Sequence, residues 1–413
     1  MSQTGSLGFD PRNPAFVADP YPFFRQLRSM APVWKAPIGR WFVTGYDDCA
    51  LVLKDRRFGK DYTDPEALTR RFGPTALQEP AVVELTNMML MRDPPDHTRL
   101  RSLVTQAFTA RRIEALRGRI QALADALLDK VQAQGGRPGR MDAIRDLAFP
   151  LPVLVICDLL GIPEEDQARF VTGSASGGAL LNPTPPTRAE LDAANAGVLE
   201  TGQYFERLFE LRRREPRDDL ITKLVQAEEN GDRLTTNELR ANVNLLFAAG
   251  HETTVNLIGN GILSLLRHPD QWQRLRAEPG LIPNAIEEIL RYECPVQAVA
   301  RTVAEPLELA GVPLQRSEIV VTLIGAANRD PAVFPDPDRL DVTRKDLKPL
   351  SFGGGIHFCL GAQLARIEAA IVFETLLRRL PDLRLLEPDA PQWRASFTLR
   401  GLTTLPVGWG PVG

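Results

Sequence analysis

One cysteine, Cys359, lies among glycines in the stretch 352–361, which reads FGGGIHFCLG. Glycine has no side chain, so the backbone beside this cysteine can approach a flat, bulky group closely. An apolar run at helical spacing follows from Leu364 to Leu376. A helix starting here would direct unpaired N–H groups and positive dipole at the sulfur, which favours a thiolate. A thiolate in such a loop suits the axial ligand of a haem iron. The alternative is a buried structural cysteine, which leaves the glycines and His357 unexplained.

The stretch resembles the haem-binding signature of the cytochrome P450 family at every fixed position. The matching residues are Phe352, Gly353, Gly355, His357, Cys359 and Gly361. The resemblance implies a mainly α fold with small β-sheets over essentially the whole chain. It also implies haem b (iron protoporphyrin IX), held between a long central helix and the loop that bears Cys359. In this interpretation Cys359 is the metal ligand, and Phe352, Gly353, His357 and Gly361 bind the cofactor.

The composition is that of an ordinary globular protein, with 413 residues, 44% hydrophobic and 24% charged. A net charge of -3 gives no reason to expect nucleic acid as a partner. No apolar run has the length of a membrane span, and residues 1–10 lack the pattern of a signal peptide. The four cysteines and four histidines are widely scattered, so neither disulfides nor zinc are expected. We expect a single haem domain over residues 1–413 and a cytoplasmic location.

Hydrophobic periodicity predicts a mostly helical body. The expected helices cover residues 113–134, 149–160 and 189–214, and the expected strands cover 41–44, 307–309 and 319–323. The proline-rich segment 182–187 cannot be helical and is expected to be an ordered loop or a mobile lid over substrate. The arginine run 212–214 falls at a helix end, where cations suit the dipole, and is interpreted as solvated.

The longest predicted helix begins at Thr235, which forms a capping-box pattern with Glu238, and ends at His268-Pro269. Its middle reads AAGHETT over residues 248–254. A glycine and two threonines inside a helix cost stability, so this segment is expected to open a groove. The alternative is a bend caused by threonine back-bonding.

The same segment resembles the oxygen-binding motif of the family. The resemblance implies that Ala249 and Gly250 make room for dioxygen, and that Glu252 and Thr253 deliver protons. A hydroxyl and a carboxylate suit this role, because together they can relay protons through water into a dry pocket. His251 is interpreted as a packing or surface residue.

Glu288 and Arg291 lie three residues apart on one predicted helix face. Such a pair is commonly an ordinary surface contact. The resemblance implies instead the Glu-x-x-Arg pair of the family, joined by a later arginine, for which Arg339 is the candidate. Leu340 stands where the family often has phenylalanine. These three residues are assigned to the fold and to haem loading.

Haem propionates need cationic or hydrogen-bond-donor partners. His97 and Arg101 match the His-x-x-x-Arg of the family and share one helix face. The resemblance adds Arg301 and His357 as further partners. The alternative for His97 and Arg101 is a helix turn with solvated charges.

The resemblance implies a monooxygenase that inserts one atom of O2 into an apolar or amphipathic organic substrate. Its electrons would start on NAD(P)H and arrive through a separate ferredoxin and ferredoxin reductase. Arginines expected near the cysteine side of the haem could face that ferredoxin or could be solvated: Arg99, Arg111, Arg112 and Arg366. Two other functions stay open, a peroxide-driven hydroxylase and a non-catalytic haem sensor or carrier.

The resemblance also implies a mostly apolar substrate pocket. Its predicted residues are Leu85, Met88, Met89, Leu245, Ala248, Val296, Gln297, Val299, Phe397, Thr398 and Leu399. A lipid, terpenoid, steroid or macrolide-like skeleton would suit such a lining.

Overall fold

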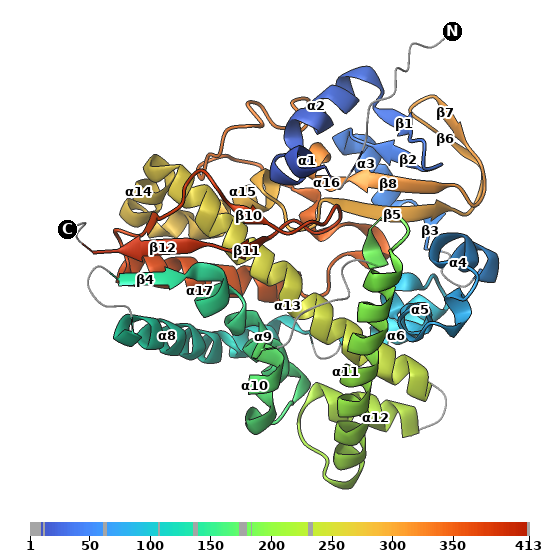
Figure 1. Ribbon diagram of the computed structural model, residues 1–413, viewed down its shortest axis with the longest axis horizontal. Coiled ribbons are helices and arrows are strands. Elements are labelled where there is room, and N and C mark those ends of the chain that lie inside the picture. Colours follow the sequence, from blue (N-terminus) through green and yellow to red (C-terminus); the bar gives the residue numbers. More distant parts are fainter. Residues whose placement is uncertain are drawn as a thin grey trace.

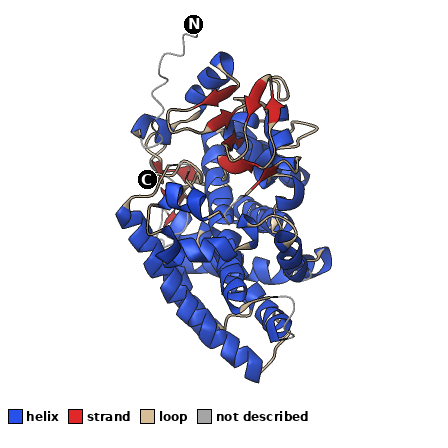
Figure 2. Ribbon diagram, turned by 90° about the vertical axis from the view of Figure 1, so that its right-hand side faces the viewer, coloured by secondary structure: helices blue, strands red, loops and turns tan. Residues whose placement is uncertain are grey.

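The computed structural model describes residues 10, 13–60, 64–105, 108–134, 139–172, 180–182, 184–229 and 234–410. Helices build most of this part of the chain, and short strands form four small sheets (Figure 1). Figure 2 shows most strands gathered toward one end of the molecule, whereas the opposite end consists of helices. The predicted mainly α fold with small sheets is therefore confirmed. None of the helices in the described ranges has the length and apolar character needed to cross a bilayer.

The helices are α1 (Pro14–Ala18), α2 (Tyr21–Met30), α3 (Tyr46–Lys54), α4 (Pro65–Phe72), α5 (Pro80–Asn87), α6 (Asp96–Thr105), α7 (Ala110–Ala115), α8 (Arg117–Gln134), α9 (Pro150–Leu160), α10 (Glu164–Thr172), α11 (Arg188–Arg214), α12 (Leu220–Glu229), α13 (Thr236–Arg267), α14 (Pro269–Ala277), α15 (Ile282–Tyr292), α16 (Ile324–Ala327) and α17 (Ala362–Arg379). The strands are β1 (Val33–Lys35), β2 (Trp41–Val43), β3 (Phe58–Gly59), β4 (Gly139–Asp142), β5 (Ala298–Val303), β6 (Leu307–Leu309), β7 (Val312–Leu314), β8 (Ile319–Leu323), β9 (Arg384–Leu385), β10 (Gln392–Trp393), β11 (Leu402–Thr404) and β12 (Pro406–Trp409).

Helix α13 is the central element of the fold (Figure 1). Its 32 residues give it a length of about 48 Å at the usual helical rise. The predicted capping box is present, since Thr235 Oγ1 accepts from Glu238 N and Glu238 Oε2 accepts from Thr235 N. Most of α13 is buried against α9, α17, α11 and α5, so tertiary packing rather than propensity holds its middle.

The largest sheet joins strands from both halves of the chain, in the order β1-β2-β8-β5-β3. Strand β8 lies parallel to β2 and antiparallel to β5. Strand β5 pairs antiparallel with the edge strand β3, with Gly59 opposite Thr302. A second sheet, β4-β12-β9, similarly joins the middle of the chain to its end.

Two details differ from the sequence-based expectations. The predicted helix 113–134 is broken at Leu116, whose N–H turns back to Ile113 O at 3.1 Å, so α7 and α8 are separate. The prediction of a solvated arginine run is wrong for Arg212. This side chain is 1% exposed and its Nε donates to Asp219 Oδ2 at 2.6 Å, because the chain folds back after α11.

The proline-rich segment is non-helical where it is described, and α11 begins directly after its cap Thr187. Pro183 and residues 1–9, on which the signal-peptide expectation rested, lie outside the described residues. Residues 180–182 are held from two sides. Arg71 of α4 donates to Leu180 O at 3.0 Å and to Asn182 O at 3.1 Å, and Thr398 N donates to Asn182 Oδ1 at 3.2 Å.

Candidate functional site

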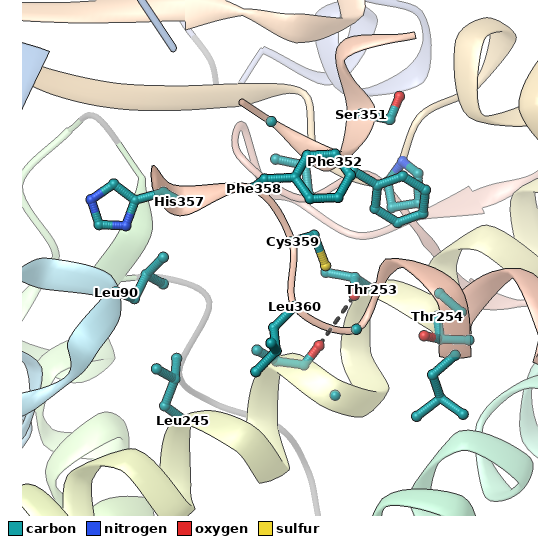
Figure 3. A pocket seen from close by; sticks show the side chains of 18 of the residues that line it. Leu90, Leu245, Thr253, Thr254, Ser351, Phe352, His357, Phe358, Cys359 and Leu360 are labelled. Carbon is teal, nitrogen blue, oxygen red and sulfur yellow. Dashed lines mark hydrogen bonds between the residues drawn. The ribbon is translucent and has the colours of Figure 1, made fainter. Parts of the chain in front are cut away.

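The loop before α17 brings Cys359 into a cavity, as Figure 3 shows. Gly353 and Gly355 have φ values of +72° and +63°, which favour glycine. A Cβ on Gly355 would lie 2.7 Å from Leu53 O, so α3 packs directly on this loop. Cys359 N donates to Phe352 O at 2.9 Å, which closes the loop around the sulfur.

Burial raises the pKa of the Cys359 thiol, while the Gly361 N–H, Arg101 and Arg366 act in the opposite direction. The protein alone therefore holds the thiol protonated, and the expected helix-dipole effect does not dominate. A bound metal ion would reverse this balance, because coordination deprotonates a thiol. Burial also raises the pKa of Cys157 and Cys294, each to about 12, and neither lines the cavity.

Helix α13 faces Cys359 across the cavity through Ala249, Gly250 and Thr253 (Figure 3). The cavity has a volume of about 260 Å³ and mostly apolar walls. A Cβ on Gly250 would lie 2.7 Å from Ile156 Cδ1, so this glycine lets α9 approach α13. Thr253 Oγ1 donates to Ala249 O at 3.2 Å, the back-bonding that the sequence left open. Its hydroxyl nevertheless borders the cavity.

Glu252 points away from this lining and toward Arg394, next to β10, with 3.7 Å between Oε1 and Nη1. Burial raises the pKa of Glu252, and Arg394 opposes this rise. His251 is buried and packs on Phe149 and Phe247, and its Nδ1 lies 2.7 Å from Phe247 O. It is therefore a packing residue.

A cluster of cationic and imidazole side chains forms one edge of the cavity. Its members are Lys60, His97, Arg101, Arg301 and His357. The two imidazole rings lie 4.4 Å apart, and His97 Nδ1 and His357 Nε2 are buried without a hydrogen-bond partner. Burial, Lys60 and Arg301 lower the pKa of His357 to about 2, and burial lowers that of His97.

This cluster fits the carboxylates of a haem. Arg101 uses Nη2 to hold Phe358 O at 2.6 Å, which ties α6 to the cysteine loop. Buried donors without partners are costly, and two carboxylates would satisfy them. Lys60 was not predicted, because its only sequence signal is its position beside a short strand.

Glu288 and Arg291 form a fully buried, bidentate ion pair with N–O distances of 2.7 and 2.8 Å. Arg291 also donates to Pro337 O and Arg339 O. The prediction that the Arg339 side chain completes the group is wrong. That side chain is 67% exposed, and Arg344 Nε lies 3.3 Å from Glu288 instead. The backbone carbonyl of residue 339 takes the inner position.

Four residues of the predicted substrate pocket line the cavity: Met89, Leu245, Val296 and Val299. The other predicted residues lie outside this lining: Leu85, Met88, Ala248, Gln297, Phe397, Thr398 and Leu399. Phe397, for example, stacks on Phe16, and Gln297 Nε2 donates to Cys294 O. Leu90, Leu246 and Pro295 line the cavity and were missed, each one residue away from a predicted position.

Comparisons with known proteins agree with this geometry. Residues 200–389 match the cytochrome P450 family. The chain is 43% identical to the cytochrome P450 monooxygenase PikC of Streptomyces venezuelae, over 98% of this chain and 93% of that protein. It is 42% identical to the vitamin D(3) 25-hydroxylase of Pseudonocardia autotrophica, over 100% and 99% of the two chains. The crystal structure of P450BioI in complex with an acyl carrier protein carrying hexadec-9Z-enoic acid superposes with a TM-score of 0.87, at 40% identity, covering 96% of this chain and 100% of that one.

The chain therefore belongs to the cytochrome P450 family. It is an enzyme of the monooxygenase class, and membership implies a haem iron. The orphaned imidazole nitrogens and the glycine-lined thiol are what such a cofactor requires of the protein.

Proposed function

We propose that this enzyme is a haem-thiolate monooxygenase in which Cys359 holds the iron. It inserts one atom of O2 into an apolar or amphipathic small molecule. One observation carries the proposal: Cys359 and the α13 segment with Gly250 and Thr253 line the same apolar cavity, and cationic groups border it. When bound, the haem iron supplies the activation of dioxygen, which a thiolate ligand favours.

The residues of the chain divide the remaining tasks. His97, Arg101, Arg301 and His357 bind the propionates of haem b, and the glycines of the cysteine loop let the backbone approach the ring. Phe352 and Gly361 border the same surface. Because apolar side chains exclude water from the cavity, a proton must come from a held group.

Thr253 holds a proton at Oγ1 beside the cavity, and Glu252 resupplies it from the Arg394 side. The adjacent positions of the two residues in α13, and the boundary that Thr253 shares with the cavity, support this relay.

Electrons come from NAD(P)H through a separate ferredoxin and its reductase. The relatives cover 98% or more of this chain, which leaves no segment for a flavin or iron–sulfur domain within it. Three of the four candidate docking arginines have acidic partners of their own: Arg99 with Glu238, Arg112 with Asp218, and Arg366 with Glu287. Arg111 is exposed and is the better candidate contact for an acidic ferredoxin.

The substrate class follows from the cavity walls. Met89, Leu90, Leu245, Val296 and Val299 provide apolar contact area on the α13 side. A lipid, terpenoid, steroid or macrolide-like skeleton fits this lining. The vitamin D(3) hydroxylase relative is consistent with such a skeleton.

The reduced enzyme under carbon monoxide tests the ligand assignment. We expect the strongly red-shifted band typical of thiolate ligation in the wild type and its loss in Cys359→Ser. Cys157→Ser, a buried thiol away from the cavity, should keep the band. If Cys359→Ser retains it, another residue holds the iron.

Turnover is tested separately. A compound library is screened for spectral shifts, and hits are incubated with NADPH and a surrogate ferredoxin system. Product that depends on substrate and ferredoxin supports the monooxygenase. Tight binding without NADPH consumption would favour a haem sensor or carrier, and product formed only with peroxide would favour a peroxide-driven hydroxylase.

A further inference from the structure

Two neighbouring strands place like charges opposite each other. Strands β3 and β5 are antiparallel with Gly59 opposite Thr302, so the next pair in this register is Lys60 and Arg301. The two residues are only 8% and 4% exposed. Like charges directly opposite each other destabilise a sheet, and burial adds the cost of removing both from water.

Neither charge is neutralised by the described part of the chain. Lys60 Nζ has Ala300 O at 3.4 Å, and Arg301 Nη1 has the same carbonyl at 3.1 Å. Asp93 is the nearest acid, but its Oδ2 accepts from the backbone N–H of Lys60 at 2.8 Å. Within the described ranges, no carboxylate oxygen lies within 4.0 Å of either side-chain cation.

The position of Lys60 is set by Asp93. A Cβ on Gly59 would lie 2.6 Å from Asp93 Oδ2, so only glycine lets this carboxylate reach the end of β3. The backbone of residue 60 is thereby fixed, and its side chain borders the cavity that contains Cys359.

The charges of this cavity edge require two further carboxylates. Lys60, Arg101 and Arg301 are the cations, whereas the pKa of each neighbouring histidine is lowered, which favours neutral rings. Asp93 offsets one of the three positive charges. Two carboxylates placed in the cavity would offset the other two, and a haem carries two propionates.

We infer that Lys60 is a haem-binding residue that holds one propionate together with Arg301, between β3 and β5. His97, Arg101 and His357 hold the other propionate. The inference rests on the proposed haem site and adds to it a residue from the N-terminal part of the chain.

Haem retention and reduction potential test this role. Lys60→Met, Lys60→Arg and the control Lys35→Met are compared; Lys35 lies in β1 of the same sheet, 49% exposed and paired with Glu318. We expect Lys60→Met to lose haem to apomyoglobin about ten- to a hundredfold faster, the value of one charge-assisted hydrogen bond. Its reduction potential should fall, because a buried positive charge stabilises the reduced iron. Lys60→Arg and Lys35→Met should behave like the wild type.

A second comparison separates propionate binding from a general effect on the fold. The same proteins are assembled with haem dimethyl ester, whose propionates carry no charge. We expect the difference between wild type and Lys60→Met to disappear, and Lys60→Gln provides the same comparison if the methionine variant does not fold. An equal difference with both haems would overturn the inference, as would unchanged haem loss and potential in Lys60→Met. Loss of the thiolate band in the wild type would instead overturn the proposed function.

Discussion

Two adjacent residues of α13 have different surroundings, although a single motif contains both. Thr253 borders the cavity with its hydroxyl bonded back to Ala249 O, whereas Glu252 turns toward Arg394. A threonine that is already bonded within its helix can still accept a proton on its remaining lone pairs. The hydroxyl and the carboxylate therefore contribute separately, and two substitutions can distinguish them.

Thr253→Ala should uncouple the enzyme without emptying its cavity. The hydroxyl is needed only after dioxygen has bound, so haem content and substrate-induced spectral shift should stay near wild type. Product per NADPH should fall about tenfold or more while hydrogen peroxide rises, the size expected for one proton-transfer group. Thr254→Ala, at the neighbouring buried position, is the control. Unchanged coupling in Thr253→Ala would make Thr253 a packing residue.

Arg394→Gln should move the pH dependence of turnover. The arginine lowers the pKa of Glu252 against the rise that burial causes, so its removal raises that pKa further. Because activity requires the acid to carry its proton, the alkaline limb of kcat should shift to higher pH. Arg267→Gln, at the far end of α13, should not move the limb. A limb that stays in place in Arg394→Gln would separate Glu252 from the relay.

Residues of this kind mark the limit of what the sequence predicts. Cys359, His357, Glu252 and Thr253 lie within contiguous motifs and were identified directly. Lys60, Arg394 and Arg344 reach their partners only through contacts between segments that are far apart in the chain. No local pattern reveals such contacts, and this is also why the position of the Arg339 side chain was predicted wrongly.

At the scale of elements, local signals specified the helices well. Caps such as Thr187 and Thr235 begin α11 and α13 where the sequence indicates. The errors came where neighbouring elements decide the outcome. Gly250 makes room for Ile156 of α9, and Arg212 is buried because α12 folds back over the end of α11. Periodicity reports which face of a helix is apolar, but not which neighbour covers it.

The Glu288–Arg291 pair ties α15 to the segment before the cysteine loop and should be needed for folding. Glu288→Gln leaves a buried arginine without its counter-charge, which costs about 3–5 kcal/mol. We expect mostly haem-free or insoluble protein. Glu287→Gln is the matched control, since its partner Arg366 is 38% exposed and a surface pair contributes about 1 kcal/mol or less. Soluble, fully haem-loaded Glu288→Gln with low turnover would instead assign the pair a catalytic role.

At the scale of the whole molecule, residues 180–182 connect three segments that are distant in sequence. Arg71 of α4 and Thr398 near the C-terminus hold this short stretch from two sides. The long gaps between these positions explain why the sequence predicted only a loop or lid here.

Arg71→Met should release this stretch. We expect the amides of Leu180 to Asn182 to exchange hydrogen faster than in wild type, with exchange in α13 unchanged. In wild type, a tight ligand should slow exchange here if the predicted lid over substrate is correct. Equal protection with and without ligand would describe a rigid connector.

The strand order also determines when the protein can fold during its synthesis. Strand β2 pairs with β8, and β3 pairs with β5, so the first strands made must wait for partners near residues 300 and 320. At about 5–20 residues per second, a ribosome needs about 15–60 s to close that gap. The cavity takes side chains from position 60 through position 368. Haem therefore meets its complete site only when nearly all of the chain has emerged, and the unpaired early strands depend until then on chaperones or on transient local contacts.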